Sequence, residues 1–128
     1  MTFLSALWFY MLPQSPKPSM HEIATSLYVP NASDVKAGLG PFFGSATMVI
    51  NGGLECNTKS GKENAGSLKR IEYYKAFLSY FDLPEEDGLE CATLKPFSTS
   101  SSSYYPQNLD KNWNYGHSDE CKVVPWQT

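Results

Sequence analysis

The apolar residues between positions 68 and 81 recur at intervals of three and four, the spacing that places side chains on one face of an α-helix. They are Leu68, Ile71, Tyr74, Phe77, Leu78 and Phe81. This is the clearest amphipathic pattern in the chain, and Pro84 requires the helix to end near Asp82. With 128 residues, the chain is long enough for one domain with a modest core.

A second, shorter helix is predicted near the N-terminus. It is expected to be buried, with Trp8 in the core, because its apolar residues also recur at helical spacing: Leu4, Leu7, Trp8 and Met11. Pro13 stops this pattern because proline lacks an N–H donor and clashes with the preceding turn. Residues 13–18 contain three prolines and are predicted to be extended, with backbone groups free to face ligand or solvent.

Glycine, proline and capping residues punctuate the middle of the chain. Ser19 and Glu22 have the spacing of a capping box, which predicts a helical turn that carries Ile23 and Leu27 and ends at Pro30. A glycine-rich flexible turn is expected at 38–44, followed by a segment over 46–54 in which Met48, Val49 and Ile50 are buried. Gly52-Gly53 predicts a sharp turn or a close backbone approach. The segments are predominantly helical and joined by Gly/Pro loops.

Charge and side-chain chemistry exclude several classes of function. The net charge is −3 and the ten basic residues are scattered, so no stripe matches a nucleic-acid backbone. The apolar run at 3–12 is too short to span a membrane and lacks the basic flank of a signal peptide. His21 and His117 are isolated, and the acidic residues 85–87 suit a solvated loop better than a cation site. We expect no metal, no cofactor, no nucleic acid and no membrane partner.

The three cysteines, Cys56, Cys91 and Cys121, imply one disulfide and one remaining thiol in a secreted protein, or three reduced thiols in a cytosolic one. The serine-rich residues 98–103 are typical of a linker. The residues beyond, with Trp113 and Trp126, show no helical or strand period.

Six motifs occur in an order that resembles the catalytic domain of glycoside hydrolase family 19 chitinases. They are residues 6–11 (ALWFYM), 13–19 (PQSPKPS), 50–56 (INGGLEC), 70–75 (RIEYYK), 89–91 (LEC) and 96–97 (PF). The resemblance implies a mainly α, lysozyme-like lobe over 1–97, with an irregular C-terminal tail over 98–128. It pairs Cys56 with Cys91, leaves Cys121 outside the disulfide, and implies secretion although no convincing signal peptide is present.

The same resemblance implies roles for five residues. Glu55 and Arg70 match positions that form a charge network behind the catalytic acid, where a carboxylate fixes the orientation of the guanidinium. An ordinary salt bridge remains an alternative for this pair. Asn51, Gln14 and Lys17 match positions that line the sugar-binding cleft, and amide and ammonium donors suit N-acetyl and hydroxyl groups. Two alternatives remain open: Asn51 is an ordinary turn residue before Gly52-Gly53, and Lys17 is an ordinary solvated lysine.

The resemblance covers only the C-terminal half of the family's catalytic domain. Inverting hydrolysis needs two separated carboxyl groups, and the family's two catalytic glutamates precede the position that matches Trp8. We therefore expect a chitinase-family protein whose isolated chain binds chitin or chitooligosaccharide weakly, self-associates through an exposed lobe face and is inactive. Whether it is an enzyme stays open. The alternatives are a non-catalytic chitin-binding or structural remnant, and a partial gene model of an intact enzyme.

Overall fold

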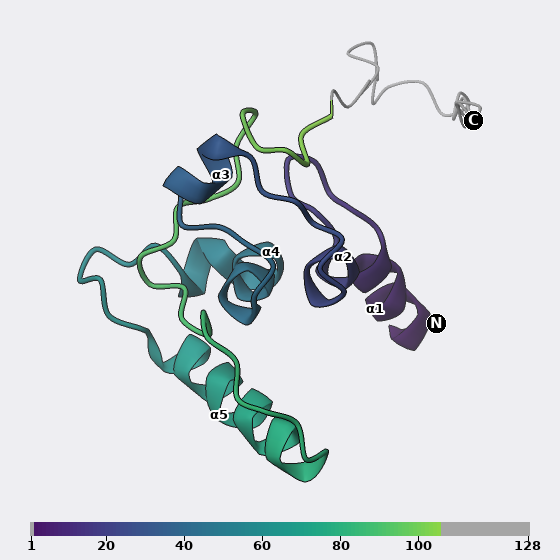
Figure 1. Ribbon diagram of the computed structural model, residues 1–128, viewed down its shortest axis with the longest axis vertical. Helices are drawn as coiled ribbons and strands as arrows, with labels where there is room; N and C mark the ends of the chain where they lie inside the picture. The colour runs from purple at the N-terminus through teal and green to yellow at the C-terminus, as the bar shows by residue number, and fades with distance from the viewer. Residues whose placement is uncertain (1, 106–128) are drawn as a thin grey trace, which may run out of the picture.

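The computed structural model describes residues 2–105 and shows a mainly α architecture around one central helix (Figure 1). Its helices are α1 (Thr2–Met11), α2 (Met20–Ala24), α3 (Ala32–Lys36), α4 (Phe43–Glu55) and α5 (Ala65–Tyr80). Helix α4 contacts α2 and α5, and α1 contacts α2. Within residues 2–105, the one β feature is an isolated bridge between Gln14 and Lys17, and no helix has the length and hydrophobicity needed to cross a membrane.

The hydrophobic core surrounds α4 and draws on segments from much of the chain. It comprises Ile23, Tyr28, Leu39, Met48, Val49, Cys56, Cys91, Leu94 and Phe97. A disulfide joins Cys56 to Cys91 across 35 residues, as the resemblance implied. It connects the end of α4 to the segment that follows α5, and so ties the last part of the folded region to the central helix.

Helix α5 confirms the strongest periodicity in the sequence, but most of its apolar stripe is not buried. The helix spans Ala65–Tyr80 and ends at its cap, Phe81. Of the predicted stripe, Leu78 is buried, whereas Leu68, Phe77 and Phe81 are 55–64% exposed. The helix extends away from α4 (Figure 1), the one helix it contacts in the described part of the chain. The spacing of apolar residues predicts that a helix forms, but burial of those residues depends on another segment packing against them.

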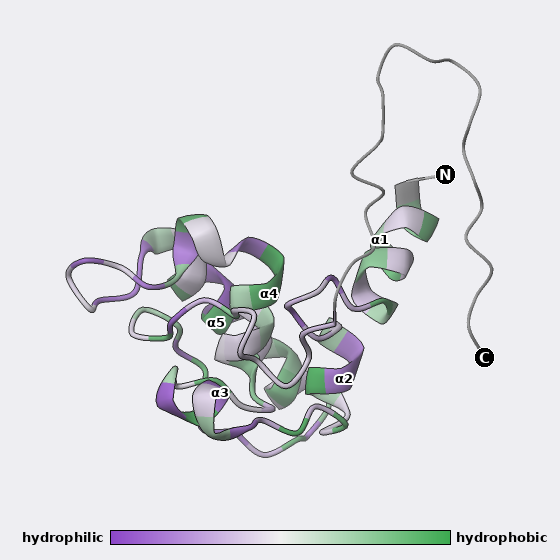
Figure 2. Ribbon diagram, turned by 90° about the horizontal axis from the view of Figure 1, so that it is seen from above, coloured by the Kyte–Doolittle hydropathy of each residue, from purple (hydrophilic) through white to green (hydrophobic). Residues whose placement is uncertain are grey.

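Helix α1 differs from expectation in the same way. The helix is present, yet Leu4, Leu7, Trp8 and Met11 are 44–67% exposed, so the predicted burial and the assignment of Trp8 to the core are wrong. Figure 2 shows α1 standing apart from the body of the molecule. Among the described helices it contacts α2, which is too short to cover its apolar surface.

The proline-rich segment after α1 forms a tight turn, so the prediction of an extended segment is wrong. The backbone N–H of Gln14 donates to the carbonyl of Lys17 at 3.1 Å, and the reverse hydrogen bond is 2.9 Å. Pro16 is the third residue of this turn, and the Ser15–Pro16 peptide is cis. Cis proline at the third position is compatible with chain reversal. The turn brings residues 14 and 17 side by side.

The capping box at the start of α2 is confirmed, because the side chains of Ser19 and Glu22 bond each other's backbone N–H groups. The helix is shorter than predicted. It ends at Ala24, and Thr25 caps it, so Leu27 lies outside the helix and is exposed. Proline at position 30 is therefore not what ends it.

Helix α4 begins earlier and continues further than the sequence suggested. It starts at Phe43, so Gly44 belongs to the helix, and it includes Gly52 and Gly53, where a sharp turn was one expectation. Met48 and Val49 are buried, but the expected burial of Ile50 is wrong. A side chain at Gly44 would place Cβ 2.1 Å from the Glu90 carbonyl oxygen, so this glycine allows the segment after α5 to lie against α4.

The serine-rich segment, expected to be a linker, is bound to the rest of the fold. The backbone N–H of Ser102 donates to Asp34 Oδ2 at 2.9 Å, and Asn31 Nδ2 donates to the Ser100 carbonyl at 2.9 Å. Asn31 and Asp34 also form the capping box of α3. The remaining sequence predictions for the tail, including Cys121 and His117, lie outside the described residues.

Candidate functional site

The site lies where α4 ends and α5 begins, and it starts with a break in α4 at Asn51. This residue has φ −147° and ψ 27°, outside the helical region, while the residues on both sides remain helical. Its side-chain amide donates to Glu55 Oε1 at 2.6 Å. Glu55 lies one helical turn after the break at Asn51, so the backbone conformation at Asn51 positions the contact.

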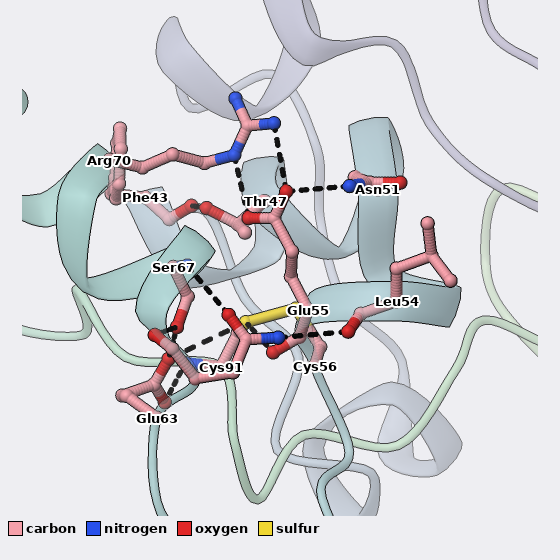
Figure 3. A network of polar contacts seen from close by, with 11 residues as sticks. Phe43, Thr47, Asn51, Leu54, Glu55, Cys56, Glu63, Ser67, Arg70 and Cys91 are labelled. Atoms are coloured by element: carbon pink, nitrogen blue, oxygen red, sulfur yellow. Dashed lines mark hydrogen bonds and ion pairs between the residues drawn. A yellow bond between two sulfur atoms is a disulfide. The ribbon is translucent and has the colours of Figure 1, made fainter.

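Glu55 and Arg70 form the bidentate ion pair at the centre of the site (Figure 3). Arg70 Nε donates to Glu55 Oε2 at 2.7 Å and Nη2 donates to Oε1 at 3.0 Å. The prediction that these residues lie within ion-pair reach is confirmed. The carboxylate side chain is 9% exposed, whereas the arginine side chain is 38% exposed, so the pair presents its cationic side toward solvent. Two parallel hydrogen bonds fix the plane of the guanidinium.

The ion pair controls the protonation state of Glu55. Hydrogen bonds from Arg70 lower the pKa of the Glu55 carboxyl, burial opposes this shift, and the Asn51 amide adds to the lowering. The carboxylate in turn raises the pKa of Arg70. Glu55 therefore stays ionised at neutral pH and cannot supply a proton there. Its chemical contribution is to hold Arg70 and Asn51 in a fixed arrangement.

Asn64 joins the two helices that carry the pair, and it was not among the site residues predicted from the sequence. Its Oδ1 accepts from the backbone N–H of Ser67 as the N-cap of α5, while its Nδ2 donates to the Leu54 carbonyl at 2.8 Å. The side chain thus serves the last turn of α4 and the first turn of α5 together. Asn immediately before a helical pattern was the available signal.

Glu63 is a second residue that the sequence analysis missed. Its Oε1 accepts from the backbone N–H of Cys91 at 2.8 Å and from that of Ala92, and its Oε2 accepts from the Ser67 hydroxyl. Figure 3 shows this carboxylate beside the disulfide. It connects the loop before α5 to Cys91, and no pattern in the sequence indicates contacts across so many residues.

Gly66 explains how α5 approaches Glu55 closely. A Cβ atom built at this position would lie 3.1 Å from Glu55 Cδ, a contact tighter than ordinary packing. Glycine therefore leaves room for the buried carboxylate at the start of α5. A glycine just before a helical pattern is the signal that could have indicated this close approach.

The structure brings the Lys17 side chain to α4, close to the position of Asn51 in that helix. Lys17 Nζ donates to the Val49 carbonyl at 2.9 Å, two residues before the break in α4. Gln14 is held in the same turn through its backbone bonds to Lys17. All three residues expected to line a sugar cleft are partly exposed, and the turn and α4 meet at this hydrogen bond.

Glu22 and Glu72, two other carboxylates on the neighbouring helices, have partners of their own. Glu22 accepts from Ser19 in the capping box, and Glu72 pairs with Lys69 on the exposed surface of α5. Among residues 2–105, no three His, Cys, Asp or Glu side chains are grouped in a way that could hold a metal ion. The described arrangement can therefore orient a guanidinium and present amide and ammonium donors.

Comparisons with known proteins agree on one family. The family model described as "Chitinase class I" matches residues 1–91. Endochitinase A2 of Pisum sativum is 40% identical over 99 residues, which cover 77% of this chain and 30% of the relative. Acidic endochitinase WIN6 of Populus trichocarpa is 41% identical over 96 residues, which cover 75% of this chain and 28% of the relative.

Chitinase 12 of Oryza sativa subsp. japonica is 40% identical over 98 residues, with 77% of this chain and 29% of the relative covered. The chain thus spans less than a third of the length of each of these three relatives. The segments that supply Asn51, Glu55, Arg70 and the disulfide all lie inside the matched region. The family model extends over well more than half of the sequence, and this chain belongs to glycoside hydrolase family 19, the class I chitinases.

Proposed function

We propose that this chain provides part of a chitin-hydrolysing site, to which it contributes one wall of the sugar-binding cleft and the ion pair that orients Arg70. The observation that carries this proposal is the Asn51–Glu55–Arg70 network inside the region that matches the chitinase family. Relatives of this region are named endochitinases, which favours chitin or chitooligosaccharide as the ligand.

In this proposal, the residues of the network have different tasks. Arg70 lies beside the catalytic acid and modulates its pKa, while Glu55 offsets the arginine charge and fixes its orientation. Asn51 uses one amide N–H for Glu55, which leaves its second N–H and its carbonyl oxygen for an N-acetyl or hydroxyl group. Gln14 and Lys17 contact the same sugar chain from the neighbouring turn.

The isolated chain is proposed to bind but not to hydrolyse. Hydrolysis needs a protonated carboxyl at the leaving group and an ionised carboxylate at the water. Glu55 has a lowered pKa and gives both of its oxygens to Arg70, which makes it unsuitable as the acid. Each missing proton transfer is worth roughly 10²- to 10⁴-fold in rate. The resemblance places the family's acid and base glutamates before the position that matches Trp8, and the proposal assigns neither role to a residue of 2–105.

Two further properties belong to the same proposal. The exposed apolar residues of α1 and α5, such as Trp8 and Phe77, are expected to promote self-association, because large apolar surfaces on soluble proteins associate. The Cys56–Cys91 disulfide supports secretion, since structural disulfides persist in oxidising compartments. Sedimentation velocity over a concentration series measures the first of these properties.

The central test incubates the purified 128-residue chain with a hexamer of β-1,4-linked N-acetylglucosamine. Product analysis by chromatography should show no cleavage, and an NMR titration should show binding with a Kd of about 1 mM, weak because only part of the cleft is present. Asn51→Ala should weaken binding by roughly threefold to tenfold, the effect of losing one or two hydrogen bonds.

Glu55→Gln and the matched surface variant Glu72→Gln complete the experiment. Neither substitution should change the product profile, because the wild-type chain is itself expected not to hydrolyse the hexamer. Cleavage by the wild type that disappears in Glu55→Gln but persists in Glu72→Gln would make Glu55 a catalytic carboxylate and reject the proposed role. No binding of the hexamer at millimolar concentration would reject the sugar-binding wall.

A further inference from the structure

Lys17 makes a hydrogen bond that a solvated or purely ligand-facing lysine would not need. Its Nζ donates to the backbone carbonyl of Val49 at 2.9 Å, across 32 residues of sequence and in a part-buried position. Val49 itself is 2% exposed. The ammonium therefore ends at the backbone of the central helix, and the contact joins the turn at 14–17 to α4.

The position of the contact on α4 is informative. Val49 lies two residues before Asn51, where the backbone leaves the helical region. Carbonyl groups next to a break in a helix lose their regular geometry and are satisfied by other donors, often side chains. A positive donor is well suited to this task, because hydrogen bonds from charged groups are stronger than those between neutral groups.

The break in turn determines where the Asn51 side chain lies. Its amide reaches Glu55 Oε1 at 2.6 Å, and Glu55 holds Arg70 through two hydrogen bonds. One chain of contacts thus extends from Lys17 through the α4 backbone to Arg70 on α5. The turn that carries Lys17 is itself fixed by reciprocal backbone hydrogen bonds with Gln14, so the ammonium approaches α4 from a defined point.

We propose, building on the function proposed above, that Lys17 is a positioning residue: its ammonium fixes the break in α4 and thereby the Asn51–Glu55–Arg70 arrangement before any sugar binds. Lys17 has three N–H donors, and the bond to Val49 uses one of them. A sugar contact through another N–H is compatible with this role, but the positioning of Asn51 does not depend on it.

The test follows the isotope-labelled 128-residue chain by NMR without any sugar. The side-chain amide signal of Asn51 and the Nε–H signal of Arg70 report on the network directly. Lys17→Met and Lys17→Gln should both shift these signals, because methionine has no donor and the glutamine donor is one bond closer to the backbone. Lys17→Arg, which keeps a long cationic donor, should restore them. Lys75→Met, which removes a surface pair with Glu85, should leave them unchanged.

A titration with the N-acetylglucosamine hexamer then separates this inference from the proposed function. Lys17→Met should weaken binding by about tenfold, with Lys17→Arg close to wild type. Weaker binding with unmoved Asn51 and Arg70 signals would make Lys17 a simple ligand contact and overturn positioning. If the Lys17 variants showed shifted Asn51 and Arg70 signals but the wild type did not bind the hexamer, positioning would be supported and the sugar-binding wall rejected. If Lys17→Met did not fold, unmoved signals in Lys17→Gln would overturn the inference.

Discussion

Glu55 and Asp34 are two buried carboxylates whose pKa values lie below the ordinary range, and the fold stabilises their charges differently. Glu55 faces a cation, Arg70. Asp34 is 1% exposed, and none of the ion pairs within residues 2–105 includes it. Burial alone would raise the pKa of Asp34, but backbone N–H groups of Ser102 and Asn31 lower it.

This difference separates Glu55, which orients a functional side chain, from Asp34, which holds two segments of the fold together. At Asp34 the backbone N–H groups of Asn31 and Ser102 both donate to Oδ2, which anchors residue 102 to α3 without a cation, while Oδ1 is buried without a hydrogen-bond partner. A carboxylate held by a side-chain cation fixes that cation as well, so Glu55 gives Arg70 a defined orientation. In this mainly α, lysozyme-like family architecture, the buried charge of Asp34 thus holds residue 102 against α3, and that of Glu55 orients Arg70.

The largest effect is expected from removing the disulfide, which supports the Glu55 region. In Cys56→Ser/Cys91→Ser, the free energy of unfolding should fall by about 4 kcal/mol, because the cross-link restricts the unfolded chain. Since Cys56 directly follows Glu55, the Arg70 Nε–H signal should broaden before that of the Ser102 amide. Urea denaturation and NMR measure both quantities. Simultaneous loss of the two signals would show that the regions unfold as one unit and remove the distinction between them.

Arg70→Met should have the next largest effect, about 3 kcal/mol of unfolding free energy at pH 7, because it leaves a buried carboxylate without its cation. The folded-state pKa of Glu55 is lowered in the wild type, so the contribution of the pair to stability is fully present above the ordinary pKa of glutamate, about 4.3. It is lost as the pH falls through the lower folded-state value.

The cost of Arg70→Met should therefore shrink as the pH falls below about 4.3, since a neutral Glu55 no longer needs a cation. Urea denaturation at pH 7 and pH 3 measures this change. Lys69→Met on the same helix removes only an exposed pair with Glu72 and should cost less than about 0.5 kcal/mol at pH 7. An equal cost of Arg70→Met at both pH values would contradict the role assigned to Glu55.

Asp34→Asn should have the smallest effect, about 1–2 kcal/mol, because the asparagine carbonyl oxygen can take the place of Oδ2, which accepts both backbone N–H groups. Its consequence should be local, with faster hydrogen exchange at Ser102 and an unchanged Arg70 Nε–H signal. Asp87→Asn, on the exposed loop after α5, is the matched control and should change neither. A shift of the Arg70 signal in Asp34→Asn would show that the two carboxylates are coupled.

The sequence predicted helices better than it predicted burial. Helical spacing identified α5 and α1, and the capping box identified the start of α2, because these signals depend on neighbouring residues. The same spacing could not predict the exposure of Trp8 or Phe77, since burial depends on what covers a helix. The turn at 14–17 was missed because three prolines favour both extended chain and cis turns.

The candidate site was predictable only in part. The ion pair between Glu55 and Arg70 followed from the family resemblance and is confirmed by the geometry. The roles of Asn51, Gln14 and Lys17 toward a sugar stay predictions. Glu63 could not be anticipated, because its partners Cys91 and Ala92 are separated from it by 28 and 29 residues and carry no pattern that links them to a glutamate.

The double role of Asn64 has a consequence for how this region opens. One amide group caps the start of α5 and also holds the carbonyl of Leu54 near the end of α4. Fraying of either helix end therefore removes a hydrogen bond from the other, so the two termini lose protection together rather than one at a time. The ion pair between the helices is thereby shielded from independent motion of either partner, and Arg70 stays aligned for as long as Asn64 keeps both of its bonds.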